Sequence, residues 1–304
     1  MRILVTGAAG YIGSALARAL VPGAEVLAVD QSTPEFGRPL VGNLAYPQFA
    51  RSLITPDVDV IFHLASLVSG GAEQNFELGN KVNFDATRDL LEACRLTGHR
   101  PKFIFTSSIA VYGGELPEPV TDDTPASPRL SYGAQKLMCE ILIDEYTRRG
   151  YVDGRALRLP TVMVRSGTAN TAVSGWASAI IREPLAGRDY VCPVSPQTRM
   201  ACISLGRVVD SLLHACQLSS AALGARRTLL LTGISASAQQ MWEAAKARAT
   251  GKVIFRPDAE VQAIMDAVPK ATYSVKAKSL GFRPNDGIEE IVNEYQEAAL
   301  AHHG

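Results

Sequence analysis

A tyrosine and a lysine stand four residues apart, at Tyr132 and Lys136, where the sequence predicts the start of a helix. Side chains with this spacing lie on one helix face and can reach each other. A phenol with a pKa of about 10 is a poor base at neutral pH, but a neighbouring ammonium favours its phenolate. Ser108, upstream at the end of a predicted strand, can hydrogen-bond the reacting oxygen. The pattern predicts proton transfer at an alcohol, although single Tyr and Lys pairs of this kind are also common on plain helix surfaces.

A glycine-rich run, Gly7–Gly13, follows a predicted strand and leads into a predicted helix. Gly7 and Gly10 let the backbone turn sharply and approach a pyrophosphate, whose charge the N–H groups and dipole at the helix start, around Tyr11 and Ile12, would stabilise. The glycine spacing is three and three rather than the commoner two and three. The alternative is a turn that uses glycine for its conformation alone.

Asp30 ends the second predicted strand, close to the offset from Gly7 that is typical of an acid binding the ribose diol of adenosine. A carboxylate there repels a 2′-phosphate, and Gln31 and Ser32 supply no arginine in its place. Arg38 could reach a 2′-phosphate there only if the loop folds back. The sequence therefore predicts NAD as the cofactor, with a solvated turn residue as the alternative interpretation of Asp30.

Composition excludes several classes of function. Lys and Arg number 30, as do Asp and Glu, so the formal net charge is zero and we expect neither a nucleic-acid nor a membrane partner. The five cysteines include no pair at metal or redox spacing, and the histidines have no clustered ligand partners, so we expect a reduced, cytoplasmic compartment and no metal. No apolar run approaches the roughly 18 residues of a bilayer span.

Short apolar runs alternate with segments of helical period in the first half of the chain, which predicts an α/β fold with a doubly wound parallel sheet of the Rossmann type. Strands are expected at 3–6, 25–29, 58–65, 102–106 and 155–159, and helices at 12–20, 75–96 and 132–149, the last with Leu137, Ile141 and Tyr146 on its apolar stripe. We expect an NAD-binding domain over 1–160. Residues 161–304 are expected to form mainly a smaller substrate-binding region, with some segments returning to the main sheet.

In that second half, helices are expected at 174–186, 206–218, 238–250 and 287–300, and strands at 200–205, 228–231 and 253–255.

The run Thr106–Gly113, the Tyr132 and Lys136 pair and the three glycines together resemble the extended short-chain dehydrogenase/reductase family over most of the chain. The resemblance implies that Ser108 is catalytic, with Ser107 as a lesser candidate, that Tyr132 is the base, and that Lys136 assists it and holds the nicotinamide ribose. It also implies a cofactor site with further members at Asn43, Leu44, Leu64, Ala65, Asn83, Thr106 and Pro160. Asn43 stands where many relatives carry Asp.

At two places the sequence departs from the pattern of the nucleotide-sugar members of this family, which argues against an epimerase or dehydratase. Thr161 replaces an asparagine usual in such relatives, and of the Arg-Asp-aromatic-Ile-His pattern only Arg199 persists. The runs 67–79, 153–161 and 180–187 are instead similar to the D-erythronate dehydrogenase branch. This similarity implies oxidation of the carbon 2 hydroxyl of a small anionic sugar acid, a four-carbon aldonate, to the 2-oxo acid.

Several side chains are of suitable type to bind such a substrate. They are Ser69, Ser108, Tyr132, Thr161 and Arg199, with Arg158 and Arg165 as competitors for the substrate carboxylate. An epimerase or dehydratase with recycled NAD, and a non-catalytic cofactor sensor, are the alternative functions. The helices that begin near Asn75 and Tyr132 resemble those that pair between subunits in the family, which implies a homodimer, unless their stripes face the protein's own sheet.

Overall fold

The computed structural model describes residues 1–165 and 174–301, and these form two compact units built from interleaved segments. Unit 1 comprises Met1–Val111, Pro128–Arg158 and Val209–Leu229. Unit 2 comprises Tyr112–Ser127, Leu159–Val208 and the chain from Leu230 onward. The functional division predicted at residue 160 stays a prediction.

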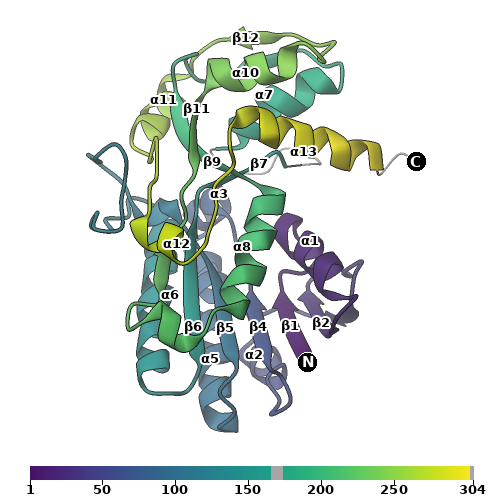
Figure 1. Cartoon of the computed structure of the whole chain (residues 1–304), viewed down its shortest axis with the longest axis vertical. Coiled ribbons are helices and arrows are strands. Elements are labelled where there is room, and N and C mark those ends of the chain that lie inside the picture. Colours follow the sequence, from purple (N-terminus) through teal and green to yellow (C-terminus); the bar gives the residue numbers. More distant parts are fainter. Residues whose placement is uncertain (166–173, 302–304) are drawn as a thin grey trace. The chain divides into compact units, whose positions relative to one another are not determined.

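The sheet of unit 1 has seven strands in the order β10-β6-β5-β4-β1-β2-β3 (Figure 1). Their bounds are β1 Arg2–Thr6, β2 Glu25–Asp30, β3 Arg38–Val41, β4 Val60–His63, β5 Lys102–Ser108, β6 Asp153–Leu159 and β10 Thr228–Leu230. The pairs from β3 across to β5 are parallel, and β1 lies between β2 and β4. The strand order reverses direction there, so the predicted doubly wound fold is confirmed, and the carboxyl ends of these strands form the edge where ligands bind in such sheets.

Helices flank this sheet (Figure 1). They are α1 Tyr11–Leu20, α2 Pro47–Ser52, α3 Ser69–Gln74, α4 Phe76–Gly79, the π-helix η1 Asn80–Asp85, α5 Ala86–Thr97, the 3-10 turn η2 Ile109–Val111, α6 Ser131–Arg148, α8 Leu205–Gln217 and α9 Ser220–Leu223. The predicted helix over 75–96 is thus three consecutive pieces, and it ends at Gly98, whose φ of 66° is the left-handed conformation expected of a C-terminal glycine.

The predicted apolar stripe of α6 is wrong at Ile141, whereas Tyr146 does pack against the core. Ile141 is 63% exposed, whereas Lys136, Cys139, Glu140 and Ile143 are buried. Cys139 and Ile143 pack into a core that side chains of β1, β4, β5 and α5 complete. The buried face of α6 therefore carries two charged groups, a pattern that a search for apolar periodicity alone does not find.

Unit 2 contains a three-stranded sheet of β7 Thr161–Met163, β9 Arg199–Ser204 and β11 Ile234–Ser237, and a two-stranded sheet of β8 Tyr190–Cys192 and β12 Val253–Phe255. Its helices are α7 Gly175–Leu185, α10 Ala238–Lys246, α11 Ala259–Asp266, α12 Val275–Ser279 and α13 Ile288–Ala301. A second core forms where residues of α7, α10 and α13 pack together. The structure confirms the four helices and three strands expected after residue 161, each within a few residues.

Residues 209–229 belong to unit 1, and the buried side chain of Arg155 attaches them to its sheet. The Arg155 side chain is fully buried, and its guanidinium donates to the carbonyls of Ala215 and Leu218 at the carboxyl end of α8 and to the Asp153 carboxylate. Lys102 donates to the Cys216 carbonyl at 2.7 Å. These bonds occupy carbonyls that the end of a helix leaves without partners.

Among the described residues, none of the helices combines the length and hydropathy that crossing a membrane requires. The five cysteines are free thiols, four of them buried.

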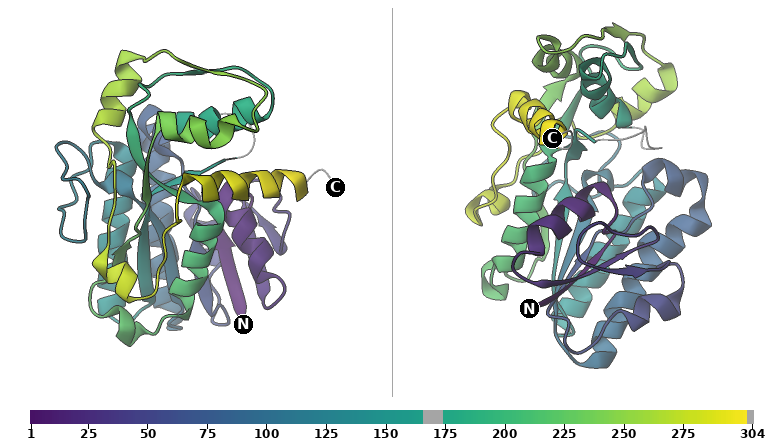
Figure 2. Two further views of the ribbon diagram at one scale, coloured as in Figure 1. Left: turned by 45° about the horizontal axis from the view of Figure 1, so that its top comes forward. Right: turned by 90° about the vertical axis from the view of Figure 1, so that its right-hand side faces the viewer.

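Helix α1 packs against β1 and β2 (Figure 2), and glycine allows its first turn to approach the loop after β1 closely. A Cβ atom on Gly13 would lie 2.0 Å from the carbonyl oxygen of Gly7. Gly7 itself has a φ of 74°, a conformation that residues with a side chain rarely adopt. Two of the three glycines are therefore required by the backbone, independently of any ligand.

We expect Gly13→Ala to lower the free energy of unfolding by about 1–3 kcal/mol, since the added methyl group forces α1 away from the loop. Chemical denaturation measures the change. Gly23→Ala is the matched control, because nothing lies within 4 Å of a Cβ atom there, and its effect should stay within about 1 kcal/mol. Equal stability of the two variants would contradict the packing argument.

Candidate active site

The loop after β1 forms an open cradle at the sheet edge. The Gly7 carbonyl accepts from Gly10 N at 3.0 Å, and α1 begins directly after Gly10 with no side-chain cap. Gly10 is exposed, and its Cβ position meets only the Gly7 oxygen, at 3.1 Å. Exposed backbone at an uncapped helix start fits the pyrophosphate of a dinucleotide, because the helix end supplies N–H groups and positive potential.

Asp30 lies beside this cradle. Its carboxylate accepts from Ala9 N at 3.0 Å and from Gln31 N at 2.7 Å, so the acid at the end of β2 is tied to the glycine loop. The Asp30 carbonyl accepts from Gly42 N at 2.9 Å, which brings Asn43 to the same edge. The Asn43 side-chain oxygen accepts from Ala45 N at 2.8 Å, and Leu44 next to it is buried. The predicted adenosine residues are thus gathered at the ends of β2 and β3.

A fully buried histidine connects the ends of β1 and β4. Thr6 Oγ1 accepts from the N–H groups of Leu64 and Ala65, so its proton goes to His63 Nδ1 at 2.7 Å. His63 Nε2 then donates to Thr87 Oγ1 at 2.9 Å, and Thr87 donates to the Asn83 carbonyl. Burial and, to a lesser degree, the Lys136 charge lower the pKa of His63 to about 3. The imidazole is therefore neutral at neutral pH, and it links hydrogen bonds rather than acting as a general acid.

Asn83 holds the loop after β4 in place. Its side-chain oxygen accepts from Ser66 Oγ and Leu67 N, and its amide donates to the Leu67 carbonyl and to Gln135 Oε1 at 2.7 Å. The residue is 1% exposed. All four of its bonds fix the loop carrying Leu64 and Ala65 against α6. Gln135 was not among the predicted site residues, and its only signal in the sequence was its place in the Ser131–Lys136 run.

Lys136 and Tyr132 meet at the end of β5, as predicted from their spacing. Lys136 Nζ donates to the Thr106 carbonyl at 2.8 Å and lies 5.5 Å from the centre of the Tyr132 ring. Lys136 is 1% exposed, whereas Tyr132 is partly exposed. Ser108 Oγ accepts from Ala110 N at 3.1 Å, which fixes the hydroxyl of the last residue of β5. A buried ammonium next to a solvent-accessible phenol is suited to proton transfer from a ligand.

Ser107 and Arg158 belong to a separate buried cluster. Ser107 Oγ donates to Glu140 Oε1 at 2.5 Å, and the Arg158 guanidinium pairs with both oxygens of that carboxylate. Glu140 is 3% exposed and Ser107 is 2% exposed. The Ser107 hydroxyl is therefore used in a buried hydrogen bond rather than for binding a ligand, and the Arg158 guanidinium is already paired with the Glu140 carboxylate. Glu140 was not among the predicted site residues.

Ser69 begins α3, and Glu73 of the same helix accepts from Ser131 N at 2.9 Å, at the start of α6. The remaining predicted residues lie in unit 2. Thr161 pairs with Cys202 in the β7–β9 register, and a Cβ atom on Gly233 would touch the Pro160 ring. Arg199 is exposed and pairs with Glu118 at 2.5 Å.

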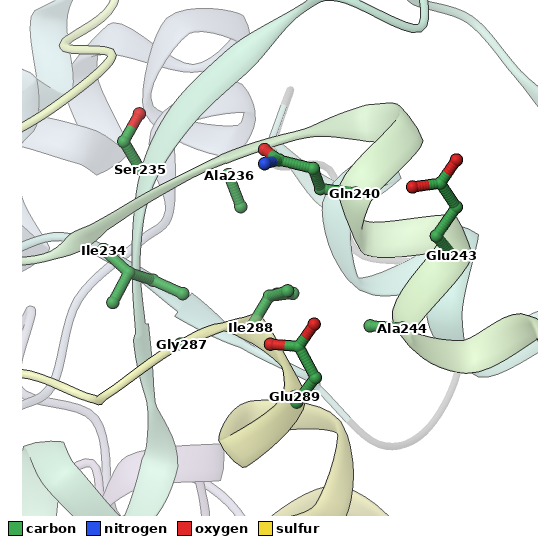
Figure 3. A pocket seen from close by; sticks show the side chains of 9 residues that line it. All are labelled: Ile234, Ser235, Ala236, Gln240, Glu243, Ala244, Gly287, Ile288 and Glu289. Carbon is green, nitrogen blue, oxygen red and sulfur yellow. The ribbon is translucent and has the colours of Figure 1, made fainter.

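Unit 2 also holds an open cavity of about 570 Å³ (Figure 3). Residues of β11, α10 and the start of α13 line it: Ile234, Ser235, Ala236, Gln240, Glu243, Ala244, Gly287, Ile288 and Glu289. No predicted substrate residue is among them, and the two glutamates would repel an anion. The cavity does not suit a sugar acid.

No group of three or more His, Cys, Asp or Glu in the described part of the chain is placed to hold a metal ion. Residues 302 and 303, two of the histidines, lie outside that part.

Known proteins resemble this chain over nearly its whole length. It is 42% identical over 321 residues to the D-erythronate dehydrogenase of Cupriavidus necator, covering 98% of this chain and 99% of the relative. It is 38% identical over 313 residues to the D-erythronate dehydrogenase of Haemophilus influenzae, with the same coverage. A crystal structure named as the nucleoside-diphosphate-sugar epimerase from Agrobacterium tumefaciens has a TM-score of 0.93 and 35% identity, covering 99% of this chain and 95% of that one.

The family model described as "NAD dependent epimerase/dehydratase family" matches residues 3–215, which hold the glycine cradle, Asp30 and the Tyr132 and Lys136 pair. The predicted family, its enzymatic nature and its cofactor NAD are confirmed. The chain belongs to the NAD-dependent epimerase/dehydratase family of extended short-chain dehydrogenases/reductases.

Proposed function

We propose that this protein is an NAD-dependent dehydrogenase that oxidises the carbon 2 hydroxyl of D-erythronate, a four-carbon aldonate, to the 2-oxo acid. The observation that carries the proposal is the buried Lys136 ammonium 5.5 Å from the Tyr132 ring at the end of β5. The two relatives named D-erythronate dehydrogenase support the substrate class.

In the proposed mechanism, Tyr132 as phenolate takes the proton of the substrate hydroxyl, and Lys136 stabilises that phenolate by its charge. Ser108 donates a hydrogen bond to the reacting oxygen. NAD, when bound, supplies the acceptor for the hydride that leaves carbon 2. The glycine cradle, Asp30 and Asn43 would hold its adenosine and pyrophosphate, while Leu64, Ala65, Asn83, Thr106 and Lys136 would hold the rest.

The second candidate is a nucleotide-sugar epimerase, because the 35% identical crystal structure carries that name. Such an enzyme would use the same pair but return the hydride to its substrate, with no net NADH. Thr161 and the replaced residues after Arg199 favour the dehydrogenase, since they depart from the nucleotide-sugar pattern.

With D-erythronate and NAD, we expect stoichiometric NADH, and we expect Tyr132→Phe to lower kcat by about 10²–10⁴ because general-base assistance is lost. NAD affinity should change little. Absorbance at the NADH band and calorimetric NAD titration measure the two effects. Parallel assays with threonates, uronic acids and UDP-sugars test the substrate class.

Tyr146→Phe is the matched control on α6, because its hydroxyl bonds Glu92 at 3.0 Å and should not affect turnover. If Tyr132→Phe kept most of the activity, Tyr132 would not be the base. Turnover of a UDP-sugar without NADH would establish the epimerase instead.

For Asp30 we expect a strong preference for NAD over NADP, which Asp30→Ser should largely remove because the repulsion of a 2′-phosphate disappears. The ratio of kcat/KM for the two cofactors measures this. Glu35→Ser, in the same loop, removes an exposed charge and should leave the ratio unchanged. A wild-type enzyme indifferent to the cofactor would refute the ribose assignment.

We also propose that the substrate carboxylate binds Arg199 in exchange for Glu118, and that Ser69 and Thr161 bind substrate hydroxyls. Arg199→Gln should raise KM for D-erythronate by about tenfold or more, the loss of a charge-assisted bond. Glu118→Gln should lower KM because it frees the guanidinium. Unchanged KM in both variants would point to Arg165 as the carboxylate partner.

The homodimer and the cytoplasmic location stay predictions. Met138 and Ile141 on the outer face of α6 are 38% and 63% exposed, which supports a subunit contact there. Light scattering measures the mass in solution, and cell fractionation tests the location.

A further inference from the structure

The Lys136 ammonium is buried without an acidic partner. The residue is 1% exposed, and among residues 1–165 and 174–301 no carboxylate lies within ion-pair distance of Nζ. Its hydrogen-bond acceptor is the Thr106 carbonyl at 2.8 Å. A charge taken out of water carries a large desolvation cost, which one neutral carbonyl offsets only in part.

An aromatic face lies against this ammonium. Nζ is 4.5 Å from the centre of the Phe105 ring, closer than the 5.5 Å to the Tyr132 ring. Phe105 is fully buried in β5, directly before Thr106, so strand and ring approach the ammonium together. A cation above a ring face is attracted by the ring quadrupole, and the attraction is strongest where water is absent.

No second charge competes for this contact. The His63 ring lies 5.7 Å from the Phe105 ring, and its neutrality, with a pKa of about 3, leaves Lys136 as the one cation over that ring in the described structure. Glu140, one turn beyond Lys136 on α6, is held by Arg158 and Ser107. The charge of Lys136 is therefore left uncancelled beside Tyr132.

We propose that Phe105 is a positioning residue whose ring face keeps the Lys136 ammonium charged and in place beside Tyr132. A carboxylate in this position would also stabilise the ammonium, but it would cancel the field that Tyr132 requires. The link to turnover rests on the proposed function of the pair.

The test replaces Phe105 with phenylalanine carrying one, two or three ring fluorines, which weakens the quadrupole stepwise and nearly preserves the shape. In the cofactor-free protein, lysine labelled with ¹³C at Cε is titrated by NMR, and the Lys136 signal is assigned by its loss in Lys136→Met. The ammonium should lose its proton at progressively lower pH as fluorines are added. An unchanged titration with three fluorines would overturn the proposal.

The second readout is single-turnover NADH formation from D-erythronate and NAD as a function of pH. The acid limb should move to higher pH, with a rate at pH 7 that falls about three- to tenfold for three fluorines and an unchanged rate at high pH. An acid limb that stays in place, or moves to lower pH, would show that the ring does not assist Tyr132.

Phe103 supplies the matched control. It is fully buried on the same face of β5 and lies 5.9 Å from the His63 ring, but no described cation lies over its ring. The same fluorines at Phe103 should leave both readouts unchanged, and equal effects at both positions would reduce the role of Phe105 to packing. If the NMR titration moves as expected but wild-type protein forms no NADH from D-erythronate, the ring contact stands and the proposed function fails.

Discussion

A neutral imidazole at the end of β4 joins the segments on which the site depends. Through His63 the hydroxyl of Thr6, directly before the glycine cradle, is connected to Thr87 and so to the backbone of Asn83. Asn83 in turn holds α6 through Gln135. Each donor in this hydrogen-bond chain is used by the next member. Displacement of any member is therefore costly, since a broken hydrogen bond leaves a buried polar group without a partner. One chain of hydrogen bonds therefore fixes the position of α6 relative to the glycine-rich loop after β1.

The parts of the site that lie close in sequence, or at the ends of regular elements, could be predicted. The spacing of Tyr132 and Lys136 fixes their common helix face, and the runs before Gly7 and Asp30 place both residues at one sheet edge. The short strands β3, β7, β8 and β11 were not predicted, although the equally short β4, β10 and β12 were. Strands of three or four residues depend on their partners for stability, so local sequence alone does not decide which of them form. Helix α6 itself was predicted, but its buried face was not, because that face includes Lys136 and Glu140 and therefore lacks a clean apolar period.

The partners of buried polar groups are the other part that sequence does not disclose. Glu140 and Ser107 are 33 residues apart, and Asn83 and Gln135 are 52 apart, so neither contact has a local signature. Ser107 and Ser108 look equivalent as neighbours in a sequence. In the structure, successive side chains of the strand point to opposite faces. The Ser107 hydroxyl therefore bonds the buried Glu140 carboxylate, whereas the Ser108 hydroxyl lies at the sheet edge.

The interleaving of the two units has a consequence for synthesis on the ribosome. β10 is the neighbour of β6 at the border of the seven-stranded sheet, and it is made about 70 residues later, after much of unit 2. Until then β6 presents unpaired backbone groups, and the Arg155 cation lacks the carbonyls of α8. During synthesis, β6 is thus for a time an unpaired edge strand that can pair with other chains. Because the segments of the two units alternate along the sequence, no single truncation yields one complete unit.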